Sequence, residues 1–280
     1  SIFVIEASSY QLEYSKLYRS KYAAILNISP DHLERHGTIS NYISAKFKLI
    51  KNQNKNSVVF INKHDKLIKN KIKRNTYKCK IITVNTKLKK KFTSIFKNEY
   101  FLSASNKENL SFVIELAKKF NVKKSNLINT VKNFKGLNYR QQIIFNSKKI
   151  LVINDSKSTS FSSSVEMLKR PGVIYWLLGG IPKKGDRFNL SKNYHKNIRS
   201  FIFGTNHKKF LLDLKNKVNS KKFSNLKKAL DELFKDIKKD NISKKTILFS
   251  PAAASFDSFK NFEDRGKYFN KLIKRYINVK

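Results

Sequence analysis

The stretch ILVINDSKST, residues 150–159, joins an apolar run to a short series of polar residues. Its first half, residues 150–154, has the length and the β-branched content of a buried strand. The second half begins with Asp155, so polar side chains stand directly beyond the carboxyl end of that strand. In open parallel sheets, ligands bind at this edge because loops and helix N-termini converge there. The stretch therefore predicts an α/β sheet with a site at its edge.

Four further apolar runs end in the same way. Each polar residue taken singly could equally be a turn residue or a helix cap. The repetition at five strand ends is what favours a binding site. The four other ends carry Glu6 after residues 3–5, Asp31 and His32 after 22–28, Gly179, Gly180 and Lys183 after 173–178, and residues 250–255 after 246–249.

Strand and helix patterns alternate along the whole chain, which is typical of α/β domains with mainly parallel sheets. A change of unit is expected at residues 136–140, giving domains 1–135 and 136–280. Residues 62–104 are polar and weakly periodic, and we assign them no role. We expect strands at 2–5, 22–28, 57–61, 81–84, 150–154, 173–178, 200–203 and 246–249, and helices at 39–52, 106–120, 124–134, 162–169, 206–217, 225–238 and 257–276.

The composition excludes several classes of protein. The formal charge of +41 over 280 residues would by itself indicate a polyanion partner such as nucleic acid. Only nine of the 60 basic residues are arginine, however, and the lysines are spread along the chain, so we expect no nucleic-acid partner. The single cysteine, Cys79, excludes an intrachain disulfide and a zinc-stabilised fold. With neither a signal peptide nor an apolar run of about 18 residues, the sequence predicts a cytoplasmic protein without a membrane span.

Two residues lie on apolar helix stripes and have two interpretations each. Lys46 follows Tyr42 at helical spacing, so its amine is either desolvated and reactive or extends to solvent from the edge of the stripe. Spacing alone favours the second. Phe262 lies on the stripe of the last helix, where spacing favours a core position over a ligand contact. Spacing alone therefore assigns neither residue to a site.

Motifs in the first half of the chain resemble those of the muramyl ligases. EASSYQLE at residues 6–13 is similar to an acidic, metal-binding strand end of that family, and NISPDHL at 27–33 to its Asn-x-x-x-Asp-His motif. YISAK at 42–46 resembles the segment that bears a carbamylated lysine, and Asn106 with Asn109 resembles an Asn-x-x-Asn pair near adenine. The related folylpolyglutamate synthetases share these features, so they identify only the superfamily.

Two motifs in the second half narrow the resemblance to the branch that adds D-glutamate. INDSKST at residues 153–159 resembles the Asn-Asp-Ser-Lys-Ala-Thr signature of that branch, and LFSPAAASFDSFKNFEDRG at 248–266 resembles its tail motif. The sequence also departs from the pattern, with Ser105 in place of histidine and Ala253 in place of cysteine or glycine. None of its eight glycines begins a G-x-x-x-x-G-K-[ST] phosphate loop.

The resemblance implies an N-terminally truncated ligase. Family members open with a UDP-binding domain and a phosphate loop, and this chain starts inside an apolar run without a methionine, so we expect a fragment that is inactive alone. On this interpretation residues 1–135 form the C-terminal part of a central ATP-binding domain with a mainly parallel sheet. Residues 136–280 form a Rossmann-like domain that binds the amino acid.

The implied reaction is ATP-dependent addition of D-glutamate to UDP-N-acetylmuramoyl-L-alanine through an acyl phosphate, a step of peptidoglycan precursor synthesis, by a monomer. A sister ligase such as a folylpolyglutamate synthetase, or a basic nucleic-acid-binding protein, is the alternative. By resemblance, His32 and Lys46 are catalytic; Glu6, His32 and carbamylated Lys46 bind Mg²⁺; Asn106, Asn109, Arg140 and Asp155 bind ATP; and Lys183, Thr159, Ser255, Phe262 and Ser8 bind the other substrates. Lys184 leaves the register of Lys183 open by one residue, although Asp186 favours Lys183.

Overall fold

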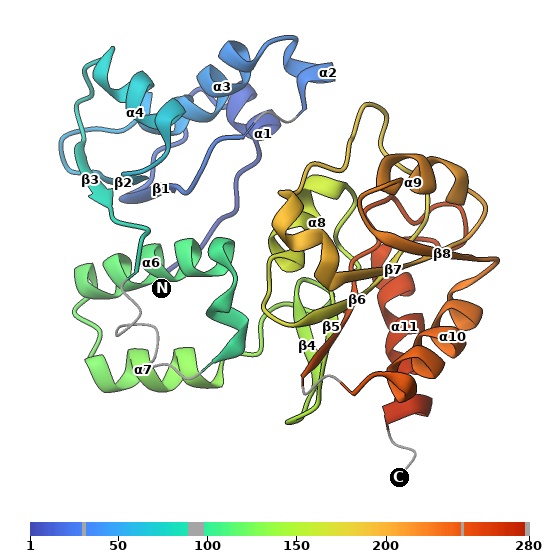
Figure 1. Ribbon diagram of the computed structural model, residues 1–280. Helices are drawn as coiled ribbons and strands as arrows, with labels where there is room; N and C mark the ends of the chain where they lie inside the picture. The colour runs from blue at the N-terminus through green and yellow to red at the C-terminus, as the bar shows by residue number, and fades with distance from the viewer. Residues whose placement is uncertain (30–31, 89–97, 242–243, 278–280) are drawn as a thin grey trace. The chain divides into compact units, whose positions relative to one another are not determined.

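A computed structural model describes residues 1–29, 32–88, 98–241 and 244–277 (Figure 1). The chain divides into two compact units, Ser1–Lys132 and Asn133–Lys280, and each is described by itself. Both units are mixed α/β with mainly parallel sheets, which confirms the predicted fold class. Within the described ranges, no helix is both long and apolar enough to cross a membrane.

The first unit holds a three-stranded parallel sheet in the order β1-β2-β3. All five residues of the central strand, β2, are buried, because helices cover both of its faces. Its elements are α1 (Ser9–Tyr14), β1 (Tyr22–Ile25), α2 (Leu33–His36), α3 (Ile39–Lys51), β2 (Val58–Asn62), α4 (Lys66–Lys73), β3 (Lys80–Val84), the 3-10 helix η1 (Glu99–Leu102), α6 (Ala104–Lys119) and α7 (Lys124–Asn133).

Alternation along β2 separates two apolar clusters. Val59 and Ile61 pack with α3, whereas Phe60 points to the other face and packs with Phe112 of α6. This period of two is what a strand covered on both sides requires. The stretch 62–104, which the sequence left without a role, supplies α4, β3 and η1 to this unit.

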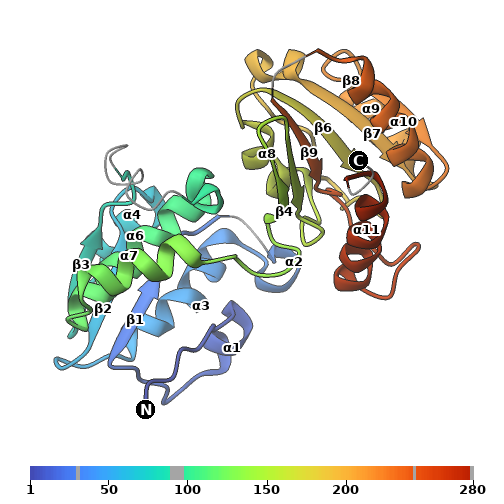
Figure 2. The ribbon, with the colours of Figure 1, turned by 90° about the horizontal axis from the view of Figure 1, so that it is seen from below.

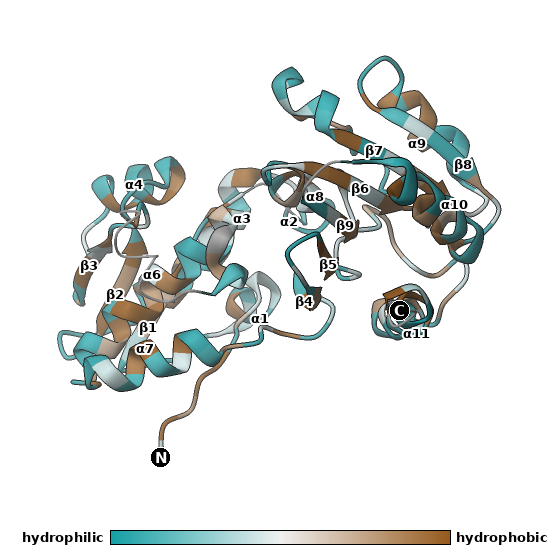
Figure 3. Cartoon of the chain, turned by 60° about the horizontal axis from the view of Figure 1, so that its bottom comes forward, coloured by the Kyte–Doolittle hydropathy of each residue, from teal (hydrophilic) through white to brown (hydrophobic). Residues whose placement is uncertain are grey.

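The strand expected at residues 2–5 is wrong. These residues form no strand, and the side chains of Ile2, Phe3, Val4 and Ile5 are 63% to 95% exposed. Figure 3 shows the stretch as a hydrophobic segment that runs free of the sheet. A strand needs a hydrogen-bonded neighbour as well as β-propensity. Among the described residues, β1 pairs only with β2, so residues 2–5 have no strand beside them. Glu6 therefore does not follow a strand.

The second unit holds a six-stranded sheet in the order β4-β5-β9-β6-β7-β8, in which only β4 runs antiparallel to its neighbour. Figure 2 shows β4 and β8 at opposite edges. The elements are β4 (Gln142–Asn146), β5 (Ile150–Asn154), α8 (Phe161–Leu168), β6 (Val173–Leu178), the 3-10 helix η2 (Lys192–Asn197), β7 (Ile198–Phe203), α9 (His207–Leu214), β8 (Asn219–Phe223), α10 (Leu226–Lys239), β9 (Lys245–Phe249) and α11 (Phe262–Ile277).

Helices cover both faces of this sheet (Figure 1). Trp176 of β6 packs with α8 and α9 on one face, while Tyr175 packs with α10 and α11 on the other. Both side chains are completely buried. The carboxyl ends of β5, β9 and β6 lie side by side in the middle of the sheet, so the loops that follow these three strands meet there.

The sequence analysis missed the two edge strands, β4 and β8. Edge strands are covered less completely than central ones, and the apolar run of β4 is only three residues long, with none of its residues fully buried. β8 reads Asn-Ser-Lys-Lys-Phe, which resembles a loop, and none of its residues is fully buried. The last helix also begins at Phe262, five residues later than expected.

Candidate functional site

Three strand ends of the second unit are tied together by backbone hydrogen bonds. The amide of Asp155, after β5, donates to the carbonyl of Phe249 at the end of β9, at 2.7 Å. Gly179, after β6, donates to Pro251 at 3.0 Å, and Ile181 pairs with Ala254 in an isolated antiparallel bridge. Three of the predicted strand ends are therefore brought together at one edge of the sheet.

Arg265 joins the same three loops from beneath, and the sequence analysis did not select it. It is 1% exposed, and burial lowers the pKa of its guanidinium to about 10. The guanidinium donates to the hydroxyl and carbonyl of Ser156 at 3.1 and 2.8 Å, to the Ala253 carbonyl at 2.9 Å, and to the Gly179 carbonyl at 3.5 Å. A buried cation satisfied by backbone carbonyls fixes the relative positions of the three loops.

Gly179 and Gly180 stand where neighbouring backbone passes close to the loop that follows β6. A β-carbon on Gly179 would lie 2.1 Å from the Phe203 carbonyl oxygen, and one on Gly180 would lie 2.3 Å from the Ala254 carbonyl oxygen. Gly180 also has a φ of +128°, which side-chain-bearing residues rarely adopt. These two positions need glycine because backbone passes directly beside them.

Asp155 is a buried carboxylate at the centre of this edge. Its Oδ1 accepts from the Gln141 amide at 3.1 Å and its Oδ2 from the Ser250 hydroxyl at 3.0 Å. Burial raises the pKa of Asp155 to about 7, against the two hydrogen bonds and the positive charge of Arg140, which lower it. A carboxyl poised near neutrality at a strand end is a mark of a functional site.

Arg140 lies in a strained segment beside Asp155. Its neighbours Tyr139 and Gln141 have positive φ values of 61° and 51°, which are uncommon for residues other than glycine. Gln141 uses its amide to hold Asp155, and the Tyr139 carbonyl accepts from the Lys157 amide at 2.9 Å. The side chain of Arg140 is exposed, so its charge is available at this edge.

The predicted amino-acid-binding residues lie in the loops around this edge. Thr159 and Lys183 are exposed, and Asp186 accepts from the Phe161 amide at 2.6 Å, which fastens the Lys183 loop to the first residue of α8. Ser255 is buried. Phe262 is half-buried beneath the Lys157 ammonium, 4.2 Å from its ring centroid, and does not belong to either core cluster. The core interpretation of Phe262 is therefore wrong.

In the first unit, three of the predicted residues lie at or in α1, α2 and α3. Ser8 caps α1, where its hydroxyl accepts from the Gln11 amide at 3.2 Å. His32 has a left-handed backbone, with a φ of 52°, and its ring lies edge-on to Tyr10 at 5.1 Å between centroids. Lys46 is half-buried, with its ammonium 5.2 Å from the Tyr42 ring centroid. Asp31 lies outside the described residues.

His36 was not predicted, although it connects the same three helices. Its side chain is buried, and its Nε2 lies 3.0 Å from the Ser9 hydroxyl of α1. Its ring packs between Tyr10 of α1 and Tyr42 of α3, at 5.6 and 5.4 Å between centroids. The Nδ1 atom is buried without a hydrogen-bond partner in the described structure. The only signal in the sequence is a second histidine four residues after His32.

The predicted magnesium site is not assembled by the described residues. Among them, no group of three histidine, cysteine, aspartate or glutamate side chains is placed to hold a metal ion. Glu6 is exposed on the irregular N-terminal segment, and unmodified Lys46 carries a cationic amine where an anionic ligand is needed. The donor set as described therefore does not fit Mg²⁺.

Asn106 and Asn109 differ in environment. Asn106 is buried in the first turn of α6, and its amide donates to the Tyr100 carbonyl at 2.8 Å, which holds η1 against the helix. Asn109 is exposed. Asn109 is thus the member of the pair whose side chain lies at the surface.

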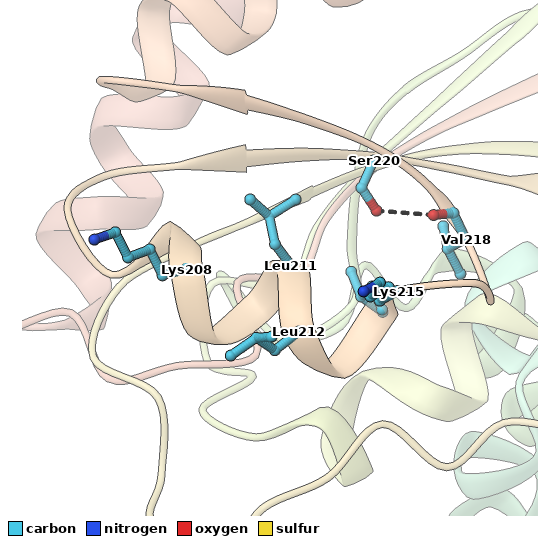
Figure 4. Close-up of a pocket in the computed structure, with 7 residues that line it drawn as sticks. Lys208, Leu211, Leu212, Lys215, Val218 and Ser220 are labelled. Atoms are coloured by element: carbon cyan, nitrogen blue, oxygen red, sulfur yellow. Dashed lines mark hydrogen bonds between the residues drawn. The ribbon is translucent and has the colours of Figure 1, made fainter.

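A pocket of about 500 Å³ lies between α9 and β8 (Figure 4). Leucine and valine side chains form most of its lining, together with two lysines and a serine. It contains none of the predicted site residues. Its lining is Lys208, Leu211, Leu212, Leu214, Lys215, Val218 and Ser220.

Comparison with known proteins relates both units to one family. Residues 1–130 match the Mur ligase middle domain. Over 98% of its length, the chain is 33% identical to the UDP-N-acetylmuramoylalanine--D-glutamate ligase of Rickettsia felis, and it spans 65% of that relative. In fold it is similar to MurF from Acinetobacter baumannii, with a TM-score of 0.65 at 15% identity over 95% of this chain and 62% of that one.

A second similar fold is the MurF ligase from Thermotoga maritima, solved in complex with ADP, with a TM-score of 0.64 at 14% identity. That similarity covers 96% of this chain and 66% of the other. At such identities the two solved structures establish the fold alone, whereas the similarity to the Rickettsia relative extends through both halves of the sequence, including the strand ends described above. The chain belongs to the Mur ligase family.

Proposed function

We propose that this chain, within the complete natural protein, adds D-glutamate to UDP-N-acetylmuramoyl-L-alanine at the expense of ATP. The observation that carries the proposal is the similarity to a D-glutamate ligase over 98% of the chain, which includes the Asp155 and Lys183 loops. These two loops meet at one sheet edge beside an exposed arginine, an arrangement suited to two anionic ligands. The cytoplasmic location and the monomeric state stay predictions.

The proposed roles follow from the chemistry of each side chain. Asp155, as a carboxylate with two oxygens, would accept ribose hydroxyls of the nucleotide, and the exposed Arg140 of the same unit would lie close to it. Asn109, exposed on the first unit, is proposed as a further nucleotide contact. The Lys183 ammonium would pair with the side-chain carboxylate of D-glutamate, and Thr159 would donate from the neighbouring loop. Each role orients a reactant, which is the main contribution that a protein makes to acyl transfer through a phosphorylated intermediate.

A panel of amino acids tests the proposed specificity. The complete protein, supplied with ATP and UDP-N-acetylmuramoyl-L-alanine, is expected to release ADP with D-glutamate and not with L-glutamate, L-alanine or D-alanine. Release of ADP only with a folate acceptor and L-glutamate would instead assign a folylpolyglutamate synthetase.

Replacing Lys183 by alanine is expected to raise the KM for D-glutamate by about ten- to a hundredfold, because a hydrogen bond to a charged group contributes roughly 1.5–3 kcal/mol. The KM for ATP should change much less. Lys184→Ala is the matched control, since it removes the adjacent exposed lysine. Equal changes in both KM values, or a larger effect of the control, would contradict the assignment of Lys183.

Carbamylation of Lys46 is proposed because it would turn a basic side chain into an anionic oxygen ligand of the kind that Mg²⁺ prefers. Carbon-13 NMR of the protein in labelled bicarbonate is expected to show one carbamate signal that Lys46→Ala removes. Lys48→Ala, a change on the same helix, should retain the signal. A wild-type spectrum without a carbamate signal would contradict the proposal.

A further inference from the structure

A chain of serine hydroxyls runs inward from Asp155. The Ser250 hydroxyl lies 3.0 Å from Asp155 Oδ2, and the Ser164 hydroxyl of α8 lies 2.8 Å from that of Ser250. The Ser158 hydroxyl follows at 2.7 Å from Ser164. All three hydroxyls belong to buried residues, and Ser164 and Ser250 are completely inaccessible to solvent. Three protein hydroxyls in line at these distances form one hydrogen-bonded chain.

The charge of Asp155 sets the direction of this chain, because each hydroxyl has a single proton to donate. An ionised Asp155 can only accept, so Ser250 donates to it. The shortest contacts then have Ser164 donating to Ser250 and Ser158 donating to Ser164, at 2.8 and 2.7 Å, in competition with the Ser160 carbonyl, which lies 3.4 Å from both of these hydroxyls. If Asp155 is protonated and donates through Oδ2 to Ser250, the direction of each following hydrogen bond in the chain can reverse. Rotation of the hydroxyl protons along this chain is therefore sufficient to connect the state of the carboxyl to Ser158.

The two ends of the chain lie at the two proposed ligand subsites. Asp155 is the proposed contact to the nucleotide. Ser158 immediately precedes Thr159, and its hydroxyl also lies 2.8 Å from that of Ser163 in the first turn of α8. The same turn is fastened through Asp186 to the Lys183 loop. Hydroxyl contacts thus lead from the nucleotide end to the first turn of α8, and the backbone of that turn connects them to the loop proposed to hold the amino acid.

We propose that the hydroxyl chain Asp155–Ser250–Ser164–Ser158 couples the nucleotide subsite to the amino-acid subsite, with Ser164 as a positioning residue that touches neither ligand. The inference rests on the proposed function. Ribose hydroxyls that donate to Asp155 favour its ionised form, which fixes the chain in one direction and orders the turn at Ser158 and Thr159. Occupation of one subsite then raises affinity at the other, and by linkage the effect is reciprocal.

The test compares coupling in the wild type and in Ser164→Ala, which removes the middle hydroxyl. ADP affinity of the complete protein is measured by calorimetry without and with saturating D-glutamate. In the wild type we expect D-glutamate to tighten ADP binding by about five- to a hundredfold, the usual range for coupled sites. In Ser164→Ala that factor is expected to approach one, while the affinity for ADP alone changes less.

Two further variants keep the result interpretable. Ser162→Ala removes an exposed hydroxyl from the same helix turn and should retain the wild-type factor. Ser158→Ala interrupts the chain at its other end, and its coupling factor is expected to approach one, as in Ser164→Ala. With two variants that break the chain, a folding defect in one of them does not decide the test. A purely structural serine cluster would lower the melting temperature and leave the coupling factor unchanged.

The outcomes separate this inference from the proposed function. If the wild type binds neither ADP nor D-glutamate, the proposed function fails. If it binds both, but the coupling factor is one in the wild type or is equal in the wild type, Ser164→Ala and Ser158→Ala, only the coupling role of the hydroxyl chain is overturned.

Discussion

Arg265→Ala is expected to lower the free energy of unfolding of the second unit by about 3–5 kcal/mol, in the range found when one partner of a buried charged network is removed. The variant leaves the carbonyls of Ser156, Ala253 and Gly179 without their buried donor, and each unsatisfied group costs roughly 1–3 kcal/mol. It also opens a cavity beneath the loops. Relief of the desolvated charge, seen in the lowered pKa of Arg265, offsets part of this loss.

Urea unfolding followed by tryptophan fluorescence measures this loss, because the single tryptophan, Trp176, is buried in the second unit. Arg275→Ala is the matched control, as it removes an exposed arginine from the same helix, α11. It is expected to change the free energy of unfolding by less than about 0.5 kcal/mol. A loss below about 1 kcal/mol for Arg265→Ala would show that the guanidinium does not hold the three loops.

The sequence was sufficient to predict the sheet edge of the second unit. Apolar runs at residues 150–154 and 173–178 form strands with those bounds, because a continuous run of this length is typical of strands covered on both faces. Polar residues at their ends then lie together as a consequence of parallel pairing. Strand periodicity and the geometry of parallel sheets were enough for this part.

The arrangement beneath that edge could not be predicted from local pattern. Arg265 lies more than a hundred residues from Ser156 in sequence. The apolar spacing of its helix marks Phe269 and Leu272 as core residues, but it does not indicate whether an arginine on that helix is buried or solvated. The same limit applies to residues 2–5, where strand propensity was correct for an apolar run but pairing depends on a neighbour elsewhere. Both outcomes depend on contacts between distant segments.

Asp155 also shows how burial changes the meaning of a motif residue. From the sequence it was expected, by resemblance, to bind ATP, and its titration could not be inferred. In the structure it is a desolvated carboxyl with a pKa of about 7, against an ordinary value of 3.8. Between these two values the folded protein holds a proton that the unfolded chain has released, so stability falls as pH rises through this window. The loss is complete about one pH unit above 7 and amounts to roughly 4 kcal/mol.

Asp155→Asn removes this pH dependence. Relative to the wild type, the variant is expected to gain about 2–4 kcal/mol of stability between pH 4 and pH 8, since asparagine is neutral throughout. Its amide can still accept from Gln141 and can donate to Ser250, so the buried contacts survive. The measurement is urea unfolding of both proteins at several pH values, in which the contributions of titratable groups common to both proteins cancel.

Ser250→Ala is the control for Asp155→Asn. It keeps the carboxyl and removes a hydrogen bond that lowers the pKa of Asp155, so the pH dependence of its stability should be at least as steep as that of the wild type. Parallel profiles for wild type and Asp155→Asn would show that Asp155 stays ionised across the range, and the desolvated carboxyl would then be stabilised by the charge of Arg140 more strongly than its burial opposes.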